Sequence, residues 1–256
     1  MRIIGIIPAR MAASRFPGKP MYNIIDRPML AHVYGRAKLY NSWDHLAIAT
    51  CDKEIEDYAI SQNYECTMTS DKHARALDRV AEAVEKITEF KVQEDDIIIN
   101  VQGDEPMIHP EMFPTLIEPI LKREEVKATI LAMLIEEESI WRNPDTVKLI
   151  YNDNHEVLYT TRSPVPYNGN KFSKELQARR IYGLFAFEWK YLKKFSAHSE
   201  TRLEKLESCD SNRILDMDFC QHIAPYPYIK SYSVDNIKDI ELVEANIKAD
   251  KYWGKY

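Results

Sequence analysis

The chain has 256 residues, of which 45% are apolar and 29% charged. This is enough for one large α/β domain or two small ones around a sizeable core, and it excludes disorder and collagen-like order. Forty acidic against 34 basic side chains give a net charge of −6, which argues against binding to the phosphate backbone of nucleic acids. No apolar run approaches the ~20 residues that span a bilayer, and no signal-peptide pattern is present, so we expect a soluble, cytoplasmic protein with no membrane partner.

Strand-like and helix-like patterns alternate through the first half of the chain. Short apolar runs predict strands at residues 2–7, 46–50, 65–68 and 96–101. Apolar residues at helical spacing predict helices at residues 29–40, 54–62 and 75–88. This order is typical of α/β proteins with right-handed crossovers, so we predict a doubly wound, mostly parallel sheet.

After Pro106 the alternation loosens. Helices are expected at residues 111–123 and 238–251, and strands at residues 127–135, 146–151, 157–161, 181–187 and 228–233. Residues 217–223 are ambiguous, and the polar residues 168–175 predict a mobile loop. Because no repeat or flexible linker interrupts the chain, we expect one domain over residues 1–256, with a smaller antiparallel subregion at about 127–225.

The segment after the first strand, residues 8–20, carries the cations Arg10, Arg15 and Lys19. It lies at the carboxyl end of a strand, where open α/β sheets bind ligands, and small residues there let backbone N–H groups approach an anion. We therefore predict a polyphosphate site; the alternative is a surface loop with solvated cations. The segment matches neither the Walker A motif nor G-x-G-x-x-G, which disfavours a P-loop kinase and a hydride-transfer enzyme.

Acidic residues follow the strand at 96–101. Asp104 and Glu105 are expected at the same sheet edge as the cations, and Mg²⁺ prefers one or two carboxylates plus phosphate and water oxygens, so Asp104 is our first candidate ligand. A turn with solvated acids is the alternative. Asp235 either completes the metal site or caps the closing helix, and both can be true together. The D-x-D at residues 216–218 falls in a helical pattern that separates its acids, so we expect solvated surface there.

Four sequence blocks, spread in order along the chain, resemble those of the CMP-Kdo synthetases, the 3-deoxy-manno-octulosonate cytidylyltransferases. They are I-I-P-A-R with S-R-F-P-G-K-P at residues 6–20, N-V-Q-G-D-E-P-M-I at 100–108, N-P-x-x-V-K at 143–148, and V-D at 234–235. The resemblance implies a nucleotidyltransferase fold of the nucleotide-diphospho-sugar transferase type, usually a homodimer. It also implies transfer of CMP from CTP to the anomeric hydroxyl of an acidic eight-carbon sugar, with release of pyrophosphate, for lipopolysaccharide synthesis.

The same resemblance assigns roles to individual residues. It implies that the CTP triphosphate is held by Arg10, Arg15 and Lys19, and that Mg²⁺ is bound by Asp104 and Asp235. Ala9 and Gln102 line the nucleotide, and the catalytic set is Arg15, Lys19, Asp104 and Asp235. The sugar-binding residues that it implies are Arg162, Tyr182, Glu204 and Glu207, and we add Arg180, which lies in the same region but departs from the family pattern.

The chain departs from the family pattern in two places. Arg75-Ala76-Leu77 replace a Ser-Gly-Thr turn, and Ala178-Arg179-Arg180 replace a His-Leu-Gly run on the sugar side. The lost histidine and gained arginines make 8-amino-3,8-dideoxy-manno-octulosonate, the 8-amino analogue of Kdo, a second candidate acceptor. Two alternatives stay open: a non-catalytic protein that binds nucleotide or sugar, and a synthetase for a CMP-sialic-acid-type product.

Overall fold

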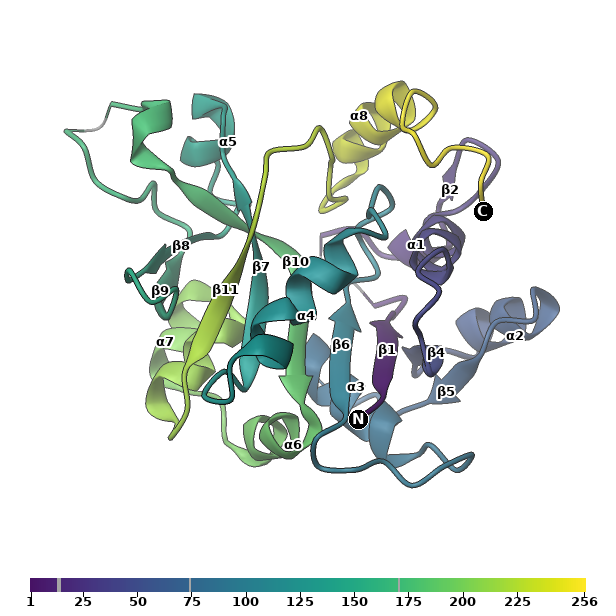
Figure 1. Cartoon of the computed structure of the whole chain (residues 1–256). Helices are drawn as coiled ribbons and strands as arrows, with labels where there is room; N and C mark the ends of the chain where they lie inside the picture. The colour runs from purple at the N-terminus through teal and green to yellow at the C-terminus, as the bar shows by residue number, and fades with distance from the viewer. Residues whose placement is uncertain (13–14, 74, 170) are drawn as a thin grey trace. The chain divides into compact units, whose positions relative to one another are not determined.

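The computed structural model describes residues 1–12, 15–73, 75–169 and 171–256, and the chain divides into two compact units (Figure 1). The first unit joins Met1–Phe113 to Lys230–Tyr256, and the second is Pro114–Ile229. The residues outside the description are Ala13 and Ser14 of the cationic loop, Ala74, and Asn170 of the predicted mobile loop. Within the described ranges, no helix is long and apolar enough to cross a membrane.

The first unit is built on four parallel strands in the order β6-β1-β4-β5. Their bounds are β1 (Ile3–Pro8), β4 (His45–Thr50), β5 (Cys66–Met68) and β6 (Ile97–Val101). Ile6 pairs with Ala47 of β4 and Asn100 of β6, so β1 and β6 end at the same sheet edge. All five residues of β6 are buried, as expected for a parallel strand covered on both faces. The four strands predicted for this half are confirmed.

Helices α1 (Met29–Lys38), α2 (Lys53–Ser61) and α3 (Ala76–Glu85) connect these strands. The amphipathic pattern of α3 buries Leu77, Val80 and Val84, as predicted. Between β1 and α1 lie the short 3₁₀ helix η1 (Lys19–Met21) and a small antiparallel hairpin, β2 (Asn23–Ile24) with β3 (Arg27–Pro28).

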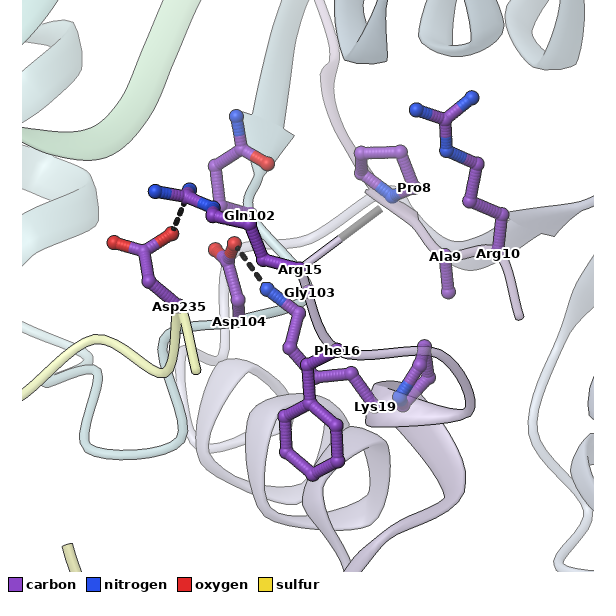
Figure 2. Close-up of a pocket in the computed structure, with 11 residues that line it drawn as sticks. Pro8, Ala9, Arg10, Arg15, Phe16, Lys19, Gln102, Gly103, Asp104 and Asp235 are labelled. Carbon is purple, nitrogen blue, oxygen red and sulfur yellow. Dashed lines mark hydrogen bonds and ion pairs between the residues drawn. The ribbon is translucent and has the colours of Figure 1, made fainter. Parts of the chain in front are cut away.

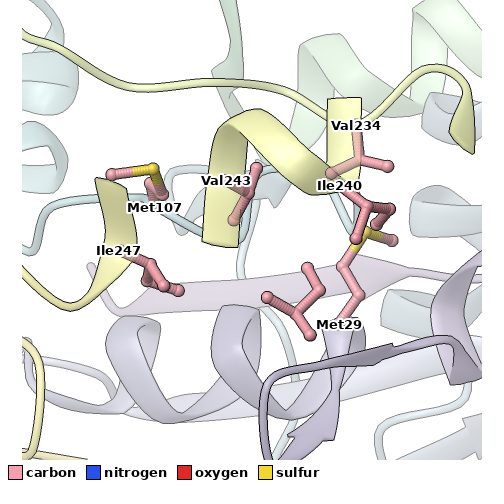
Figure 3. Packing of buried hydrophobic residues seen from close by; sticks show 7 residues of the cluster. Met29, Met107, Val234, Ile240, Val243 and Ile247 are labelled. Carbon is pink, nitrogen blue, oxygen red and sulfur yellow. The ribbon is translucent and has the colours of Figure 1, made fainter. Parts of the chain in front are cut away.

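Helix α8 (Ile237–Ile247) packs into the first unit through an apolar cluster, which we call the α8 cluster (Figure 3). Its fully buried members are Ile24, Met29, Met107, Val234, Ile240, Val243 and Ile247. The stripe of three residues from α8 is the one predicted, although the helix ends at Ile247. Phe16 packs against the same cluster. Because each fully buried aliphatic side chain stabilises the fold by about 1.5–3 kcal/mol, the cluster firmly joins α8 to three other segments of the unit.

The second unit contains strands in the order β11-β7-β10, with β8 beside β10 and β9 beside β8. Their bounds are β7 (Ala128–Leu134), β8 (Lys148–Tyr151), β9 (Val157–Thr161), β10 (Arg179–Glu188) and β11 (Gln221–Tyr226). β11 runs parallel to β7, whereas β10 runs antiparallel to β7 and β8, and β8 antiparallel to β9. The antiparallel pairs therefore occur where the alternation of the sequence loosens. The mixed α/β, mostly parallel fold class is confirmed.

Short helices complete the second unit. They are α5 (Glu138–Arg142), η2 (Lys174–Leu176), α6 (Trp189–Ala197), α7 (Arg202–Glu207) and η3 (Asp210–Asp216). The predicted helix at residues 111–123 is α4 (Met112–Lys122), which begins in the first unit and continues in the second.

Two predictions for the last third of the chain were wrong. Residues 228–233 form no strand and belong to an irregular segment, in which the Ser231 hydroxyl donates to the Met107 carbonyl at 3.5 Å. The D-x-D at residues 216–218 does not lie inside a helix, since η3 ends at Asp216. Its acids are nevertheless exposed, as predicted, and Asp218 pairs with Lys194.

Candidate active site

A cavity of about 240 Å³ lies in the first unit, where β1 and β6 end (Figure 2). The residues that line it come from the cationic loop, the loop after β6 and the segment before α8. They are Pro8, Ala9, Arg10, Arg15, Phe16, Lys19, Pro20, Gln102, Gly103, Asp104 and Asp235. All seven residues predicted for the nucleotide and the metal line this one cavity.

The cationic loop is shaped by Gly18, which has φ +76° and precedes η1. This left-handed conformation favours glycine, and it lets the Gly18 N–H donate to the Met11 carbonyl at 2.9 Å. Helix η1 then begins with Lys19, whose ammonium is 2.9 Å from Oδ2 of Asp104. The loop closure therefore directs a cation toward the acid predicted as a metal ligand.

Gly103 lets the loop after β6 approach β1. A Cβ atom at this position would lie 2.7 Å from the Pro8 carbonyl oxygen, far inside the normal contact distance for a carbon atom. Only glycine permits this approach without a backbone shift. Asp104 follows directly and so faces the cations of the first loop (Figure 2).

Asp235 was expected either to bind metal or to cap the closing helix, and the structure shows that it is not the cap. The N-cap of α8 is Asn236, whose side chain accepts from the Lys238 N–H at 3.0 Å. The carboxylate of Asp235 instead lines the cavity, with Oδ1 at 2.5 Å from Nη2 of Arg15. Burial raises the pKa of Asp235 and the nearby charge of Asp104 raises it further, whereas Arg15 lowers it.

The donor set fits a hard divalent cation. Asp104 and Asp235 are close enough for the charge of one to raise the pKa of the other, and both point into the cavity (Figure 2). Carboxylate oxygens are the ligands that Mg²⁺ prefers, usually with substrate phosphates and water completing the shell. The described residues contain no group of three or more His, Cys, Asp or Glu side chains arranged to hold a metal, so such an ion would need oxygens from a substrate.

A second, smaller cavity of about 80 Å³ shares Pro8, Ala9 and Arg10 with the first. Its remaining lining residues are His73, Arg75, Ala76 and Arg79. Arg10 donates from Nη1 to the His73 carbonyl at 3.2 Å, so this cation lies at the boundary of the two cavities. The replacement of Ser-Gly-Thr by Arg75-Ala76-Leu77 therefore falls beside the predicted nucleotide site.

Arg79 in this second cavity was missed by the sequence analysis. It is 2% exposed, and its Nη1 donates to the Thr69 hydroxyl at 2.5 Å. Its Nη2 has no hydrogen-bond partner among the described residues. Arg79 lies off the stripe formed by Leu77, Val80 and Val84, so the helical pattern gave no signal of its burial.

The loop beside Arg79 is held by Glu82, which contacts the ring of His73 and accepts from the Ser70 N–H. Burial alone would raise the pKa of Glu82, but hydrogen bonds from Lys86, the Ser70 N–H and His73 lower it to about 2. His73 is therefore held by a carboxylate that stays ionised.

The residues predicted for the sugar all lie in the second unit and all have internal partners. Glu204 is fully buried, and its two carboxylate oxygens accept from Arg213 at 2.7 and 2.9 Å. Glu207 accepts from the Tyr159 and Thr161 hydroxyls, each at 2.9 Å, and from the Arg162 N–H at 3.0 Å.

The other three sugar candidates have partners of a different kind. The guanidinium of Arg162 donates to the carbonyls of Glu207 and Pro144 at 2.9 and 2.8 Å. Tyr182 is fully buried in β10, and the guanidinium of Arg180 lies 5.1 Å from the centre of its ring. Their assignment to the sugar stays a prediction.

Comparisons with known proteins agree with the geometry of the cavity. A cytidylyltransferase family model matches residues 4–222. The 3-deoxy-manno-octulosonate cytidylyltransferase of Thermodesulfovibrio yellowstonii is 36% identical, covering 95% of this chain and 97% of its own. That of Haemophilus influenzae is 31% identical over 96% of this chain and 98% of its own.

Solved structures show the same relationship. A CMP:2-keto-3-deoxy-manno-octonic acid synthetase complexed with CTP matches with a TM-score of 0.85 and 29% identity, covering 97% of this chain and 99% of that one. A 4-diphosphocytidyl-2C-methyl-D-erythritol synthase from Anaerococcus prevotii, 18% identical with a TM-score of 0.63, shares the fold. The family resemblance of the sequence motifs is confirmed, and the chain belongs to the cytidylyltransferase family, among relatives named 3-deoxy-manno-octulosonate cytidylyltransferase.

Proposed function

We propose that this protein transfers CMP from CTP to the anomeric hydroxyl of an acidic eight-carbon sugar, Kdo or its 8-amino analogue, in lipopolysaccharide synthesis. The observation that carries the proposal is the meeting of Arg15 and Lys19 with Asp104 and Asp235 in one cavity. Cations alone would bind many anions, and acids alone many cations. Together they match a nucleoside triphosphate that arrives with a divalent metal ion.

The cations have a direct role in binding the triphosphate. Arg10, Arg15 and Lys19 line the cavity from one loop, and the guanidinium fork of arginine suits phosphate oxygens. Lys19 and Arg15 are paired with the two acids. We propose that these ion pairs open when CTP binds, so that the cations turn to phosphate oxygens and the acids to the metal.

The two acids are the proposed metal ligands. Cytidylyltransferases that use CTP generally need a divalent metal ion, and we propose Mg²⁺, held by Asp104 and Asp235. When bound, the ion would neutralise phosphate charge and lower the pKa of the attacking hydroxyl.

The chain's own contribution to the reaction is positioning and charge. The sugar hydroxyl gives up its proton to solvent as its oxygen attacks the α-phosphorus in line, the bond from that phosphorus to the bridging oxygen breaks, and pyrophosphate leaves. Arg15 and Lys19 stabilise the charge that develops on the leaving group, an effect that is strong in a partly enclosed site. Ala9 and Gln102 orient the nucleotide from the ends of β1 and β6, so no nucleophilic side chain is required.

For the acceptor we propose a sugar-binding edge formed by residues of the second unit. Arg162, Arg180, Tyr182, Glu204 and Glu207 are the residues assigned to it. The ion pair of Glu204 with Arg213 and the hydrogen bonds of Glu207 support a role in shaping this edge. Because Ala178-Arg179-Arg180 replace the family's His-Leu-Gly run on the sugar side, the 8-amino analogue is to be tested as an acceptor beside Kdo.

The test is pyrophosphate release from each of the four nucleoside triphosphates with a panel of acidic sugars and ample Mg²⁺. We expect turnover with CTP and with Kdo, its 8-amino analogue, or both, and a product that carries CMP on the anomeric oxygen. Tight CTP binding without turnover of either acceptor would overturn the proposal. Turnover of sialic acid alone would move the acceptor to another class.

We also propose a homodimer that works in the cytoplasm, where CTP is available. The homodimer follows from the family resemblance, and light scattering of the purified protein tests it. A mass near 29.9 kDa, that of a single chain, would contradict it.

A further inference from the structure

Asp239, in the first turn of α8, holds the backbone of Asp235. Its Oδ2 accepts from the Asp235 N–H at 2.8 Å and from the Asn236 N–H at 2.9 Å. Asp239 does not line the cavity and is only half-buried, so it reaches the site through the backbone.

This arrangement goes beyond ordinary helix capping. In a capping box, the side chain at the third helical position accepts from the N–H of the N-cap residue, and this side chain is usually Glu or Gln. Here the N-cap is Asn236 and the third position is a shorter acid, Asp239. One of its oxygens takes the N-cap N–H and, in addition, the N–H of the preceding residue. That preceding residue is the proposed metal ligand.

The backbone just before Asp235 is held as well. The Val234 N–H donates to the Asp104 carbonyl at 2.9 Å, and the ammonium of Lys19 donates to the Val234 carbonyl at 2.7 Å. The Val234 side chain is fully buried in the α8 cluster (Figure 3). The backbone is therefore held on both sides of Asp235. Val234 is bonded to the backbone of Asp104, and the Asp235 N–H is bonded to Asp239. These two anchors together set the direction of its carboxylate.

We propose that Asp239 is a positioning residue that holds the Asp235 carboxylate in place for the divalent cation bound with CTP. The inference rests on the proposed function, because it requires Asp235 to be a metal ligand. Groups that orient metal ligands commonly change metal affinity 10–100-fold when they are removed. Since Asp235 is one of only two protein ligands proposed, freeing its backbone should weaken metal binding more than it weakens the fold.

The test compares Asp239→Ala with Asn236→Ala. Both substitutions remove hydrogen bonds from the first turn of α8, but only Asp239→Ala frees the Asp235 N–H. Asp239→Asn is the conservative variant, because its amide oxygen can still accept both N–H groups. For each protein, the rise in Tm at a fixed CTP concentration is measured against Mg²⁺ concentration, and the rate against Mg²⁺ at saturating sugar.

We expect the two alanine variants to lower the Tm without ligand by similar amounts. The Mg²⁺ concentration for half-maximal CTP stabilisation should rise about tenfold in Asp239→Ala, within the range found for such groups. It should change less than about twofold in Asn236→Ala, and Asp239→Asn should restore most of the loss. At saturating Mg²⁺, kcat of Asp239→Ala should approach that of the wild type.

An equal rise in the half-maximal Mg²⁺ concentration in the two alanine variants would overturn the proposal, because Asp239 would then act only as a helix cap. An unchanged Mg²⁺ midpoint in Asp239→Ala, or an Asp239→Asn that behaves like the alanine, would overturn it too. These results leave the proposed function standing, because the wild type would still bind CTP with Mg²⁺. A wild type without Mg²⁺-dependent CTP stabilisation would instead remove the proposed function, and this inference with it.

Discussion

At the residue scale, two ion pairs lie in the cavity, and the Lys19–Asp104 pair differs from ordinary surface pairs, whereas the Arg15 side chain of the other pair is 50% exposed. Lys19 is only 13% exposed, and besides Asp104 it also binds the Val234 carbonyl. Exposed ion pairs usually contribute only 0–1 kcal/mol to stability. The burial of Lys19 beside an acid in a cavity therefore indicates a binding role more than a stabilising one.

Lys19→Ala should lower kcat/KM for CTP by about 100-fold, because removing one preorganised donor to developing charge typically costs a factor of 10²–10³. Steady-state kinetics with varied CTP measure the effect. Lys53→Ala is the matched control, since this lysine is 69% exposed and pairs with Glu56 and Asp57, its neighbours on α2. A loss below threefold in Lys19→Ala would contradict its assignment to the triphosphate.

Glu204 is predicted from the family resemblance to be a sugar residue, yet its contacts are those of a buried structural pair. Arg213 is 1% exposed, so Glu204→Gln leaves a buried guanidinium without its ionic partner. Breaking such a pair usually costs 3–5 kcal/mol, and we expect about 3 kcal/mol by urea unfolding. Asp218→Asn, which breaks a solvent-exposed pair with Lys194, should leave the urea midpoint nearly unchanged. A raised KM for the sugar with unchanged stability would show direct contact instead.

At the element scale, the segment after α8 is tied to α1 by Asp250. Its Oδ1 lies 2.7 Å from Nη1 of the fully buried Arg36, and its Oδ2 lies 2.7 Å from Nε2 of His109. Burial alone would raise the pKa of Asp250, but hydrogen bonds from His109 and the Tyr252 N–H, together with the charge of Arg36, lower it from 3.8 to about 2. The stability of this region should therefore depend on acid pH.

Because the pKa of Asp250 is lower in the folded state, its ionisation stabilises the fold above pH 4, and this contribution is lost as the pH falls from about 4 to 2. A shift of nearly two pKa units corresponds to about 2 kcal/mol. The free energy of unfolding of Asp250→Asn should therefore lie at least about 2 kcal/mol below that of the wild type at pH 7, and the gap should narrow toward pH 2. Asp57→Asn, at an exposed site on α2, is the control. A gap that does not change with pH would contradict the ionic role of Asp250.

At the scale of the whole molecule, binding of CTP with Mg²⁺ should raise the free energy of unfolding and the Tm. A ligand at 100 times its Kd stabilises the folded state by about 2.7 kcal/mol. For a chain of this size, that corresponds to a rise in Tm of roughly 5–10 °C. Differential scanning fluorimetry should show the rise with CTP and much less with ATP, GTP or UTP at the same concentration. Equal shifts for all four nucleotides would contradict a cytidine-specific site, and chelation of Mg²⁺ should reduce the CTP effect.

The order and type of most elements follow from the sequence, because they depend on local patterns. The alternation of apolar strands and amphipathic helices gives the parallel part of the fold, and the stripe Ile240, Val243 and Ile247 gives the buried face of α8. The cationic loop and Asp104 are also recognisable, since each follows a strand end where parallel α/β sheets bind ligands. These features depend on spacing along the chain. The strands, the helices and the buried stripe are confirmed; the cationic loop and Asp104 line one cavity, and their roles in binding stay predictions.

Contacts between distant segments needed the tertiary structure. Whether Asp235 caps α8 or faces the cavity was undecided, because both roles suit an acid before a helix; the hydrogen bonds of Asn236 and Asp239 decided it. Residues 228–233 look like a strand but find no neighbouring strand with which to form a ladder. Arg79 and the Glu204–Arg213 pair likewise became visible only in three dimensions, since burial and pairing depend on residues far away in the chain. Local spacing thus determined which side chains could take part in the chemistry, and packing decided which of them meet.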